Sequence, residues 1–234
     1  MLKHLFRCGR NRVHKLKKKL NIYSTRKKAY KVTTNSKHNN SVAPNLLGDK
    51  YKASKPNQVW VSDITYIPTG EGWLYCCIVK DLFTKKIVGY STSSRIDAKL
   101  CLDALNMAIY RQKPSKQQEL ILHSDRGVQY TSSLFKNALL NLGIKQSMGR
   151  KGNPYDNAVA ENFFSCLKCE CIYLQYFFTR NSAELAIFNY IEIFYNRVRP
   201  HSGIGWISPN DFESIISSQN HSIKNFGGIE SNVA

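Results

Sequence analysis

Short apolar runs in the middle of the chain are typical of β-strands. They cover residues 58–67, 73–82 and 86–93, and they contain many of the Val, Ile, Thr, Tyr and Trp residues that favour strands. Pro68 to Gly72 supply a turn between the first two runs, and Phe83 to Lys85 supply one between the second and the third. The pattern therefore predicts three antiparallel strands that follow one another in a meander.

Further along the chain the apolar spacing alternates between helical and strand periods. Residues 97–111 have apolar positions close to a helical repeat, and Asp97 stands where a helix N-cap belongs. A strand over residues 119–124 follows, and then a helix over about 132–142 that stops at Gly143. The two periods in alternation predict a domain of the α/β class.

The second half of the chain continues this alternation. A short strand is expected near residues 144–148, followed by a loop over 149–157. Asp156 or Asn157 can cap the helix that comes next. Another long helix is expected over about 182–197, and it breaks before a proline.

The first 56 residues have a different pattern. Residues 1–30 mix basic and apolar positions, in which Val13, Leu16 and Leu20 allow one short amphipathic helix. Residues 31–56 are rich in Asn, Ser, Thr and Lys and are expected to form an extended linker. We therefore divide the chain into a basic, partly helical arm at 1–30, a linker at 31–56, a core domain at 57–213 and a flexible C-terminal tail at 214–234.

The chain carries 34 Lys or Arg against 16 Asp or Glu, a net charge of +18, and most of the excess lies in its first 56 residues. That segment has 16 basic residues and one acid, Asp49, whereas residues 57–234 have 18 basic residues and 15 acids. Such an arm suits a polyanion, because every phosphate that it neutralises releases a condensed counterion. DNA is the expected partner, with Lys17, Lys18 and Lys19 as contacts, although basic tails also occur on ribosome-associated and membrane-surface proteins.

The seven cysteines are an odd number scattered through the chain, and no secretory signal precedes them. This usage fits a reducing cytoplasm. No apolar run approaches the roughly 18–20 residues that a membrane span needs, so a soluble protein without a membrane partner is expected.

Three acids stand within or just after predicted elements. Asp63 lies in the first strand, Asp125 ends the fourth, and Glu161 lies near the start of a helix, 35 residues beyond Asp125. Magnesium binds oxygen ligands, usually one or two carboxylates with waters and substrate phosphates, and two such ions can support displacement at phosphorus. If the two strands are neighbours, these acids can share a metal site. The alternative is chance spacing among 16 acids, with Asp125 in an ordinary turn.

Four ordered segments resemble the integrase-like transposases of the insertion sequence 3 family. They are residues 59–67, 80–89, 123–131 and 151–158, and the similarity covers about residues 25–213. The resemblance implies a ribonuclease H-like integrase catalytic core, an α/β fold with a mixed five-stranded sheet flanked by helices. It also places Asp63, Asp125 and Glu161 at the family's three acidic catalytic and metal-binding positions.

The resemblance further implies a reaction. A DDE transposase, a polynucleotidyl transferase, uses Mg²⁺ or Mn²⁺, expected as two ions, to cut element ends and free 3′-hydroxyls. These attack a phosphodiester by transesterification, a phosphoryl transfer that requires no Ser or Cys nucleophile. The implied partners are DNA ends and target DNA, further copies of the chain on paired ends, and a companion product of an overlapping upstream frame. The implied location is the bacterial cytoplasm, associated with the nucleoid.

DNA contacts are expected at several positions outside the arm. Lys168 lies seven residues after Glu161, nearly two helical turns, so both project from one helix face. The loop at 149–157 is expected to close over DNA, although it can equally be a connector, and the segment after the last long helix can equally be packed on the core. The expected contacts in these two segments are Arg150, Lys151, Asn153, Tyr155, Asn196 and Arg199. At position 155 the family often has Trp.

Two zinc arrangements and one general base are set aside. Cys166, Cys169 and Cys171 lack a second ligand pair at finger spacing, and on a helix Cys169 and Cys171 point in different directions, so packing is favoured. His4 and His14 do not match the zinc domain of retroviral integrases. We do not expect His201 to act as a base, because a metal-bound water needs none.

Two other functions remain open. The family normally has a helix-turn-helix region before its core, and this chain is expected to begin inside or after it. A truncated, inactive DNA-binding remnant that occupies or regulates element ends is therefore the main alternative. A structure-selective nuclease on the same fold is the other.

Overall fold

The computed structural model describes residues 8–23, 41–48, 52–115, 117, 119–150 and 158–226. The chain divides into two compact units, Met1–Lys31 and Val32–Ala234. In the first unit, α1 (Arg10–Lys19) confirms the predicted amphipathic helix. None of its residues is buried. Its last turn carries Lys17, Lys18 and Lys19, whose positive charges interact favourably with the negative end of the helix dipole.

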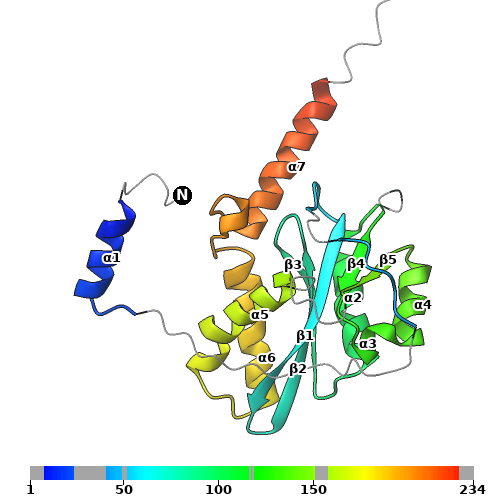
Figure 1. Cartoon of the computed structure of the whole chain (residues 1–234), viewed down its shortest axis with the longest axis horizontal. Helices are drawn as coiled ribbons and strands as arrows, with labels where there is room; N and C mark the ends of the chain where they lie inside the picture. The colour runs from blue at the N-terminus through cyan, green and yellow to red at the C-terminus, as the bar shows by residue number, and fades with distance from the viewer. Residues whose placement is uncertain are drawn as a thin grey trace, which may run out of the picture. The chain divides into compact units, whose positions relative to one another are not determined.

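The second unit is built on one five-stranded sheet with strand order β3-β2-β1-β4-β5 (Figure 1). β1 pairs with β2, and β2 with β3, in antiparallel fashion, which confirms the predicted meander. β1 also pairs with β4, and β4 with β5, in parallel. The mixed five-stranded sheet is thus confirmed. The strands are β1 (Val59–Thr69), β2 (Gly72–Asp81), β3 (Ile87–Ser93), β4 (Ile121–Ser124) and β5 (Lys145–Met148).

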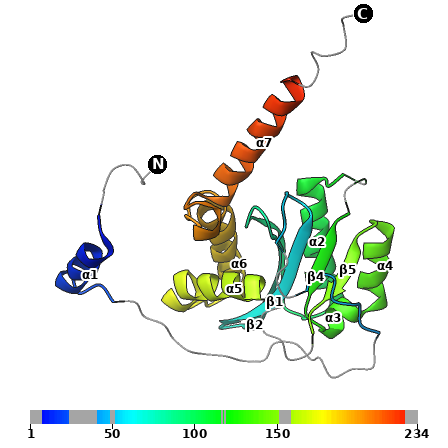
Figure 2. The same cartoon turned by 45° about the horizontal axis from the view of Figure 1, so that its top comes forward.

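Helices cover both faces of this sheet (Figure 2). One face carries α2 (Ala98–Gln112), α3 (Val128–Thr131) and α4 (Ser133–Asn141). The other carries α5 (Ala158–Glu170), α6 (Arg180–Phe188) and the π-helix η3 (Asn189–Tyr195). The remaining described helices are two short 3-10 helices and one long α-helix. They are η2 (Ile172–Leu174), η4 (Ser202–Ile204) and α7 (Pro209–Phe226).

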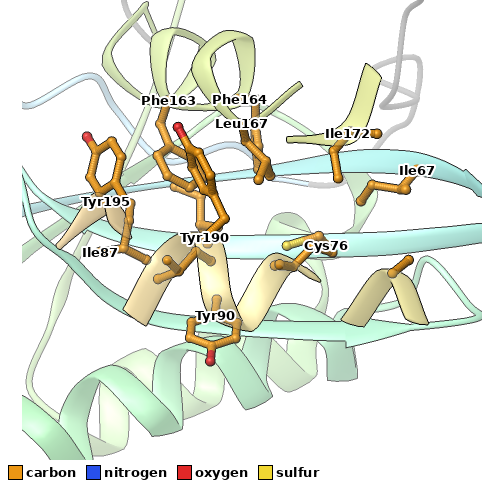
Figure 3. Close-up of a cluster of buried hydrophobic side chains, with 14 of the residues drawn as sticks. Ile67, Cys76, Ile87, Tyr90, Phe163, Phe164, Leu167, Ile172, Tyr190 and Tyr195 are labelled. Atoms are coloured by element: carbon orange, nitrogen blue, oxygen red, sulfur yellow. The ribbon is translucent and has the colours of Figure 1, made fainter. Parts of the chain in front are cut away.

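Side chains alternate along β1, so this strand contributes residues to two separate hydrophobic cores. Trp60 and Ile64 point to the α2 face, whereas Val61 and Ile67 point to the α5 face. On the α5 face, Phe163 and Leu167 pack with Tyr190 against the sheet, as Figure 3 shows. Each such side chain contributes roughly 1.5–3 kcal/mol when fully buried, so this core holds α5 against the sheet.

Local signals in the sequence explain where several helices begin. The Asp97 carboxylate accepts a hydrogen bond from the Leu100 amide at 3.0 Å, which confirms the predicted N-cap of α2. The Ser132 hydroxyl caps α4 in the same way, accepting from the Phe135 amide at 3.2 Å. Caps of this kind stabilise a helix by about 1 kcal/mol each.

The described C-terminal region differs from the prediction. α7 continues to Phe226, so residues 214–226, expected as part of a tail, are helical. The start of this helix is held to the core by an aromatic contact, because the ring centroids of Phe212 and Phe83 are 5.4 Å apart. Across the described ranges, no helix combines the length and the apolar character that crossing a membrane would require.

Candidate active site

Asp63 lies on β1, and Asp125 directly follows the end of the neighbouring strand β4. The parallel register pairs Val61 of β1 with His123 of β4, and each aspartate follows two residues later. Because side chains alternate along a strand, Asp63 points to the same side of the sheet as Val61. The adjacency of β1 and β4, on which the predicted site depended, is therefore present.

Each aspartate is held by a local hydrogen bond from the backbone. The Asp63 carboxylate accepts from the Ile64 amide at 2.8 Å, and the Asp125 carboxylate accepts from the Gly127 amide at 3.0 Å. Both side chains are half-buried. One or more of their carboxylate oxygens thus has a fixed orientation before any ligand binds.

Glu161 comes to the same region on α5. It lies in the first turn of this helix, where the N-terminal end of the helix dipole favours negative charge. Its neighbours Ala160, Phe163 and Phe164 are buried against the sheet, whereas Glu161 itself is exposed. Hydrophobic packing of one side of α5 therefore positions the carboxylate of the other side.

The three acids influence one another electrostatically. The pKa of Asp63 is raised well above its usual range, first by burial and then by the charge of Asp125, with a further contribution from Glu161. The pKa of Glu161 is also raised, by burial and by Asp125. Carboxyl groups whose pKa is raised by a neighbouring carboxylate are common at metal and catalytic sites, because a bound cation relieves the repulsion.

The donor set fits a hard divalent cation. All three side chains offer carboxylate oxygens, and Mg²⁺ typically takes only one or two of these together with water and phosphate oxygens. In the described ranges, no three His, Cys, Asp or Glu side chains are gathered in a metal-holding group. The charge of Asp125 thus acts on both Asp63 and Glu161, but the three side chains do not form a closed metal cage.

Lys168 is the basic side chain that α5 adds to this region. Its ammonium nitrogen lies 4.8 Å from the centroid of the Tyr66 ring. Burial lowers the pKa of Lys168, and the negative charge of Asp63 acts in the opposite direction. Lys168 and Glu161 thus both interact electrostatically with Asp63 from one helix.

The other expected DNA contacts are distributed unevenly. Arg150 is exposed and follows β5, whose Met148 pairs with Ser124, so it leaves the sheet at the same edge as Asp125. Lys151, Asn153 and Tyr155 lie outside the described residues. The arm residues Lys17, Lys18 and Lys19 belong to the separate first unit.

Asn196 has a structural role instead of the predicted DNA contact. Its side chain is only 2% exposed. The amide oxygen accepts from the Ile87 backbone nitrogen, and the amide nitrogen donates to the Ile87 carbonyl, both at 3.0 Å. The side chain therefore pairs with the edge strand β3 and is not available to DNA.

Arg199 is likewise engaged within the protein. Its guanidinium donates to both carboxylate oxygens of Glu170, with the shortest distance at 2.7 Å, and it lies over the Tyr195 ring. This pair connects the end of α5 to the segment after η3. The guanidinium of Arg199 is thus already paired with a carboxylate, and its DNA contact stays a prediction.

Sequence reasoning missed a buried cation close to this helix. Lys80 of β2 is 1% exposed, and its ammonium nitrogen lies 3.4 Å from the carbonyl of Val159 in the first turn of α5. Burial, followed by the charge of Lys85, lowers the pKa of Lys80 to about 7. The apolar run Cys76 to Val79 directly before Lys80 is the signal that could have indicated its burial.

The cysteines of α5 and its C-terminal end do not form a metal site. Cys166, Cys169 and Cys171 are free thiols, and none of them belongs to a metal-holding group within the part of the chain that the structure describes. The Cys171 thiol instead donates to the carbonyl of Ala186 at 3.8 Å. This contact connects Cys171 to α6, and the Cys166 thiol accepts from the Arg199 guanidinium.

The strand order and the helices on the two faces of the sheet define an integrase-type catalytic core of the ribonuclease H-like class. Two models described as "Integrase core domain" match residues 53–154 and 142–209. Among solved structures, the simian T-cell lymphotropic virus intasome in complex with the PP2A regulatory subunit B56 gamma aligns with a TM-score of 0.57 at 18% identity, over 76% of this chain and 60% of that one. The Mos1 transposase catalytic domain aligns with a TM-score of 0.50 at 16% identity, over 59% and 72% of the two chains.

Proteins with similar sequences identify the family within this fold class. The insertion element IS600 uncharacterized 31 kDa protein of Shigella sonnei is 46% identical over 87% of this chain and 74% of its own length. The transposase for insertion sequence element IS904 of Lactococcus lactis is 49% identical over 73% and 66% of the two chains. The transposase InsF for insertion sequence IS3A of Escherichia coli is 45% identical over 76% and 61%. The chain belongs to the integrase-like transposases of the insertion sequence 3 family, and it spans about two thirds of the length of the last two relatives.

Proposed function

We propose that the chain catalyses metal-dependent cleavage and strand transfer at the ends of an insertion sequence. The observation that carries this proposal is the parallel pairing of β1 with β4, because Asp63 and Asp125 each follow the paired residues Val61 and His123 by two positions. The charge of Glu161 on α5 also acts on Asp63. The raised pKa values of Asp63 and Glu161 support it, because the charge of Asp125 contributes to both. Membership of the transposase family supplies the substrate class.

Asp63, Asp125 and Glu161 would hold the metal, which we propose to be Mg²⁺ or Mn²⁺ in two positions. When bound, such ions stabilise the attacking and leaving oxygens of an in-line displacement at phosphorus. The Mos1 transposase catalytic domain, which shares this fold, was solved with Mg. The acids supply oxygen ligands that are partly fixed by the Ile64 and Gly127 amides, so little reorganisation is needed.

The remaining residues of the site hold the substrate. Lys168 places a positive charge beside Asp63, where it can contact the phosphate next to the one that reacts. Arg150 stands at the same edge of the sheet. No nucleophilic side chain is required, because the attacking group is a water or a DNA 3′-hydroxyl, so these residues act by binding and orienting DNA.

DNA is the proposed partner of both units. We also propose that further copies of the chain act together on paired ends, and that a product of an overlapping upstream frame accompanies them. The simian T-cell lymphotropic virus intasome, whose chain shares this fold, motivates the proposal of such an assembly.

The proposal is tested by incubating the purified protein with labelled duplexes that carry the element's terminal repeats, with Mg²⁺ or Mn²⁺. We expect joined strands from the wild type and none from Asp125→Asn. The matched control is Asp103→Asn, which changes an acid that pairs with Lys99 on α2. Joined product from Asp125→Asn at the wild-type rate would refute the assignment.

The alternative function is a DNA-binding remnant that occupies element ends without cutting them. The exposed basic surface of α1 favours this alternative, because it binds polyanions without any need for the acids. Retarded migration of end-containing DNA, together with absent strand joining by the wild type, would favour it. Cutting of branched DNA without preference for element ends would instead indicate a nuclease.

A further inference from the structure

Three side chains form a row that leads away from the acids. The Lys168 ammonium lies over the Tyr66 ring at 4.8 Å from its centroid. The Tyr66 and Trp73 ring centroids are 4.9 Å apart, and the rings meet edge to face at 88°. Trp73 is 42% exposed, so the row ends in a ring that is open to solvent. We call Lys168, Tyr66 and Trp73 the aromatic row.

The aromatic row begins at the candidate active site. The charge of Asp63 acts on Lys168. Tyr66 follows Asp63 by three residues, about 10 Å along β1, and alternation directs it to the other face of the sheet, where the Lys168 ammonium reaches its ring. The pairing of β1 with β4 covers only Val59 to Val61, so the stretch of β1 that carries Tyr66 has left β4. The aromatic row therefore lies along a part of β1 that is not paired with β4.

The chemistry of the row matches one class of ligand. Aromatic rings stack on the faces of nucleobases, and an adjacent lysine neutralises the phosphate that links them. Within a duplex the faces of each base are covered by its neighbours, so a ring can reach them only where bases are unpaired or at a terminus. The combination of rings and ammonium thus selects single-stranded nucleotides over paired ones.

We propose that the aromatic row binds unpaired nucleotides of the DNA strand beside the phosphate at the acids. Trp73 offers the stacking surface, Tyr66 fixes the orientation of its indole ring, and Lys168 contacts the backbone between this ring and the acids. This inference rests on the proposed function and deepens it, because it specifies that the bound end is splayed near the reacting phosphate. Stable binding then includes the opening of the terminal base pairs.

The test compares two fluorescently labelled oligonucleotides without divalent metal. One is a duplex with three unpaired nucleotides beside the cleavage position, and the other is the same duplex fully paired. Because stacking on one aromatic side chain is worth about 1–3 kcal/mol per base, Trp73→Ala should weaken binding of the splayed duplex by about tenfold. Binding of the paired duplex should change by less than about twofold on the same scale.

Two further variants separate stacking from folding. Trp73→Phe keeps an aromatic face, so it should retain most of the preference for the splayed duplex. Tyr110→Ala removes an exposed ring of α2 and should leave both affinities unchanged. An equal loss on both duplexes in Trp73→Ala, or a wild type that does not prefer the splayed duplex, would overturn the inference.

A direct readout comes from the indole itself. In a Trp206→Phe variant, the tryptophans that remain are Trp73 and the fully buried Trp60. The splayed duplex should quench the emission and the paired duplex should not, whereas equal quenching by both would contradict stacking. The quenching is measured without metal, so it does not depend on whether the protein joins strands. Quenching without strand joining would therefore support stacking on Trp73 and contradict the proposed catalysis. Normal strand joining without quenching would refute stacking on Trp73 and leave the proposed catalysis intact.

Discussion

The carboxyl group of Asp63 is held in the folded protein with a raised pKa, because it is buried beside Asp125 and Glu161. A raised carboxyl pKa means that the folded state binds protons more tightly than the unfolded state does. The metal-free protein therefore loses stability as the pH rises from the ordinary carboxyl range through the raised pKa. Burial of the charge and repulsion among the acids are the physical causes.

Asp125→Asn should relieve this repulsion. We expect the metal-free variant to melt a few degrees above the wild type at pH 8, since roughly 1 kcal/mol corresponds to about 2–4 °C in a domain of this size. Mg²⁺ should raise the melting temperature of the wild type and not that of the variant. Calorimetry at pH 5 and pH 8 measures both effects, and equal stabilisation of the two proteins by Mg²⁺ would argue against Asp125 as a ligand.

Lys80 gives a second prediction for a single residue. Its pKa of about 7 in the folded protein is below the ordinary lysine value, so the unfolded state binds more protons between about pH 7 and pH 10. Stability contributed by Lys80 thus rises with pH in that window, by roughly 2–3 kcal/mol between pH 6 and pH 9. Lys80→Met should abolish this rise in urea unfolding, and the exposed Lys52→Met should preserve it.

At the scale of elements, the junction between β3 and the segment after η3 depends on one side chain. Asn196 satisfies both backbone groups of Ile87, which lie on the edge strand. Asn196→Ala should lower the free energy of unfolding by roughly 2–3 kcal/mol, because two buried backbone groups would then have no partner. The matched control is the exposed Asn189→Ala in η3, which should change stability little in the same urea titration.

The elements themselves were largely predictable from the sequence. The meander, α2 with its Asp97 cap, and the helix at α4 follow from apolar period and cap residues, which act locally. The pairing of β1 with β4 does not, since a parallel pair is joined by a long crossover and its register is set by tertiary packing. Residue periodicity also gave no indication that residues 189–195 would adopt a π-helix.

The same limit explains why the partners of individual side chains could not be predicted. Asn196 and Arg199 follow a long helix, where contact with DNA and packing on the core were equally expected. Their partners, Ile87 and Glu170, lie far away in the sequence, so only the folded chain shows that they are already used. The acids could be proposed because their motifs resemble those of the family, and not because of their spacing.

At the scale of the whole molecule, the basic arm and the core are expected to act on the same DNA. Deletion of residues 1–30 removes α1 with its exposed basic side chains, and it leaves the second compact unit in place. The slope of log binding constant against log salt concentration should then fall by about 0.9 for each phosphate that the arm no longer neutralises. Filter binding over a salt series measures this slope, and an unchanged slope would show that the arm does not bind DNA.

The central claim is that three acids from distant positions act as one catalytic unit. Groups that act as a unit are not additive, so removal of any one should cost about as much as removal of all. The decisive measurement is the rate of strand joining in Mg²⁺ for Asp63→Asn, Asp125→Asn, Glu161→Gln and the triple variant. We predict that each single variant falls to the rate of the triple variant, whereas a single variant that joins strands as fast as the wild type would contradict the account.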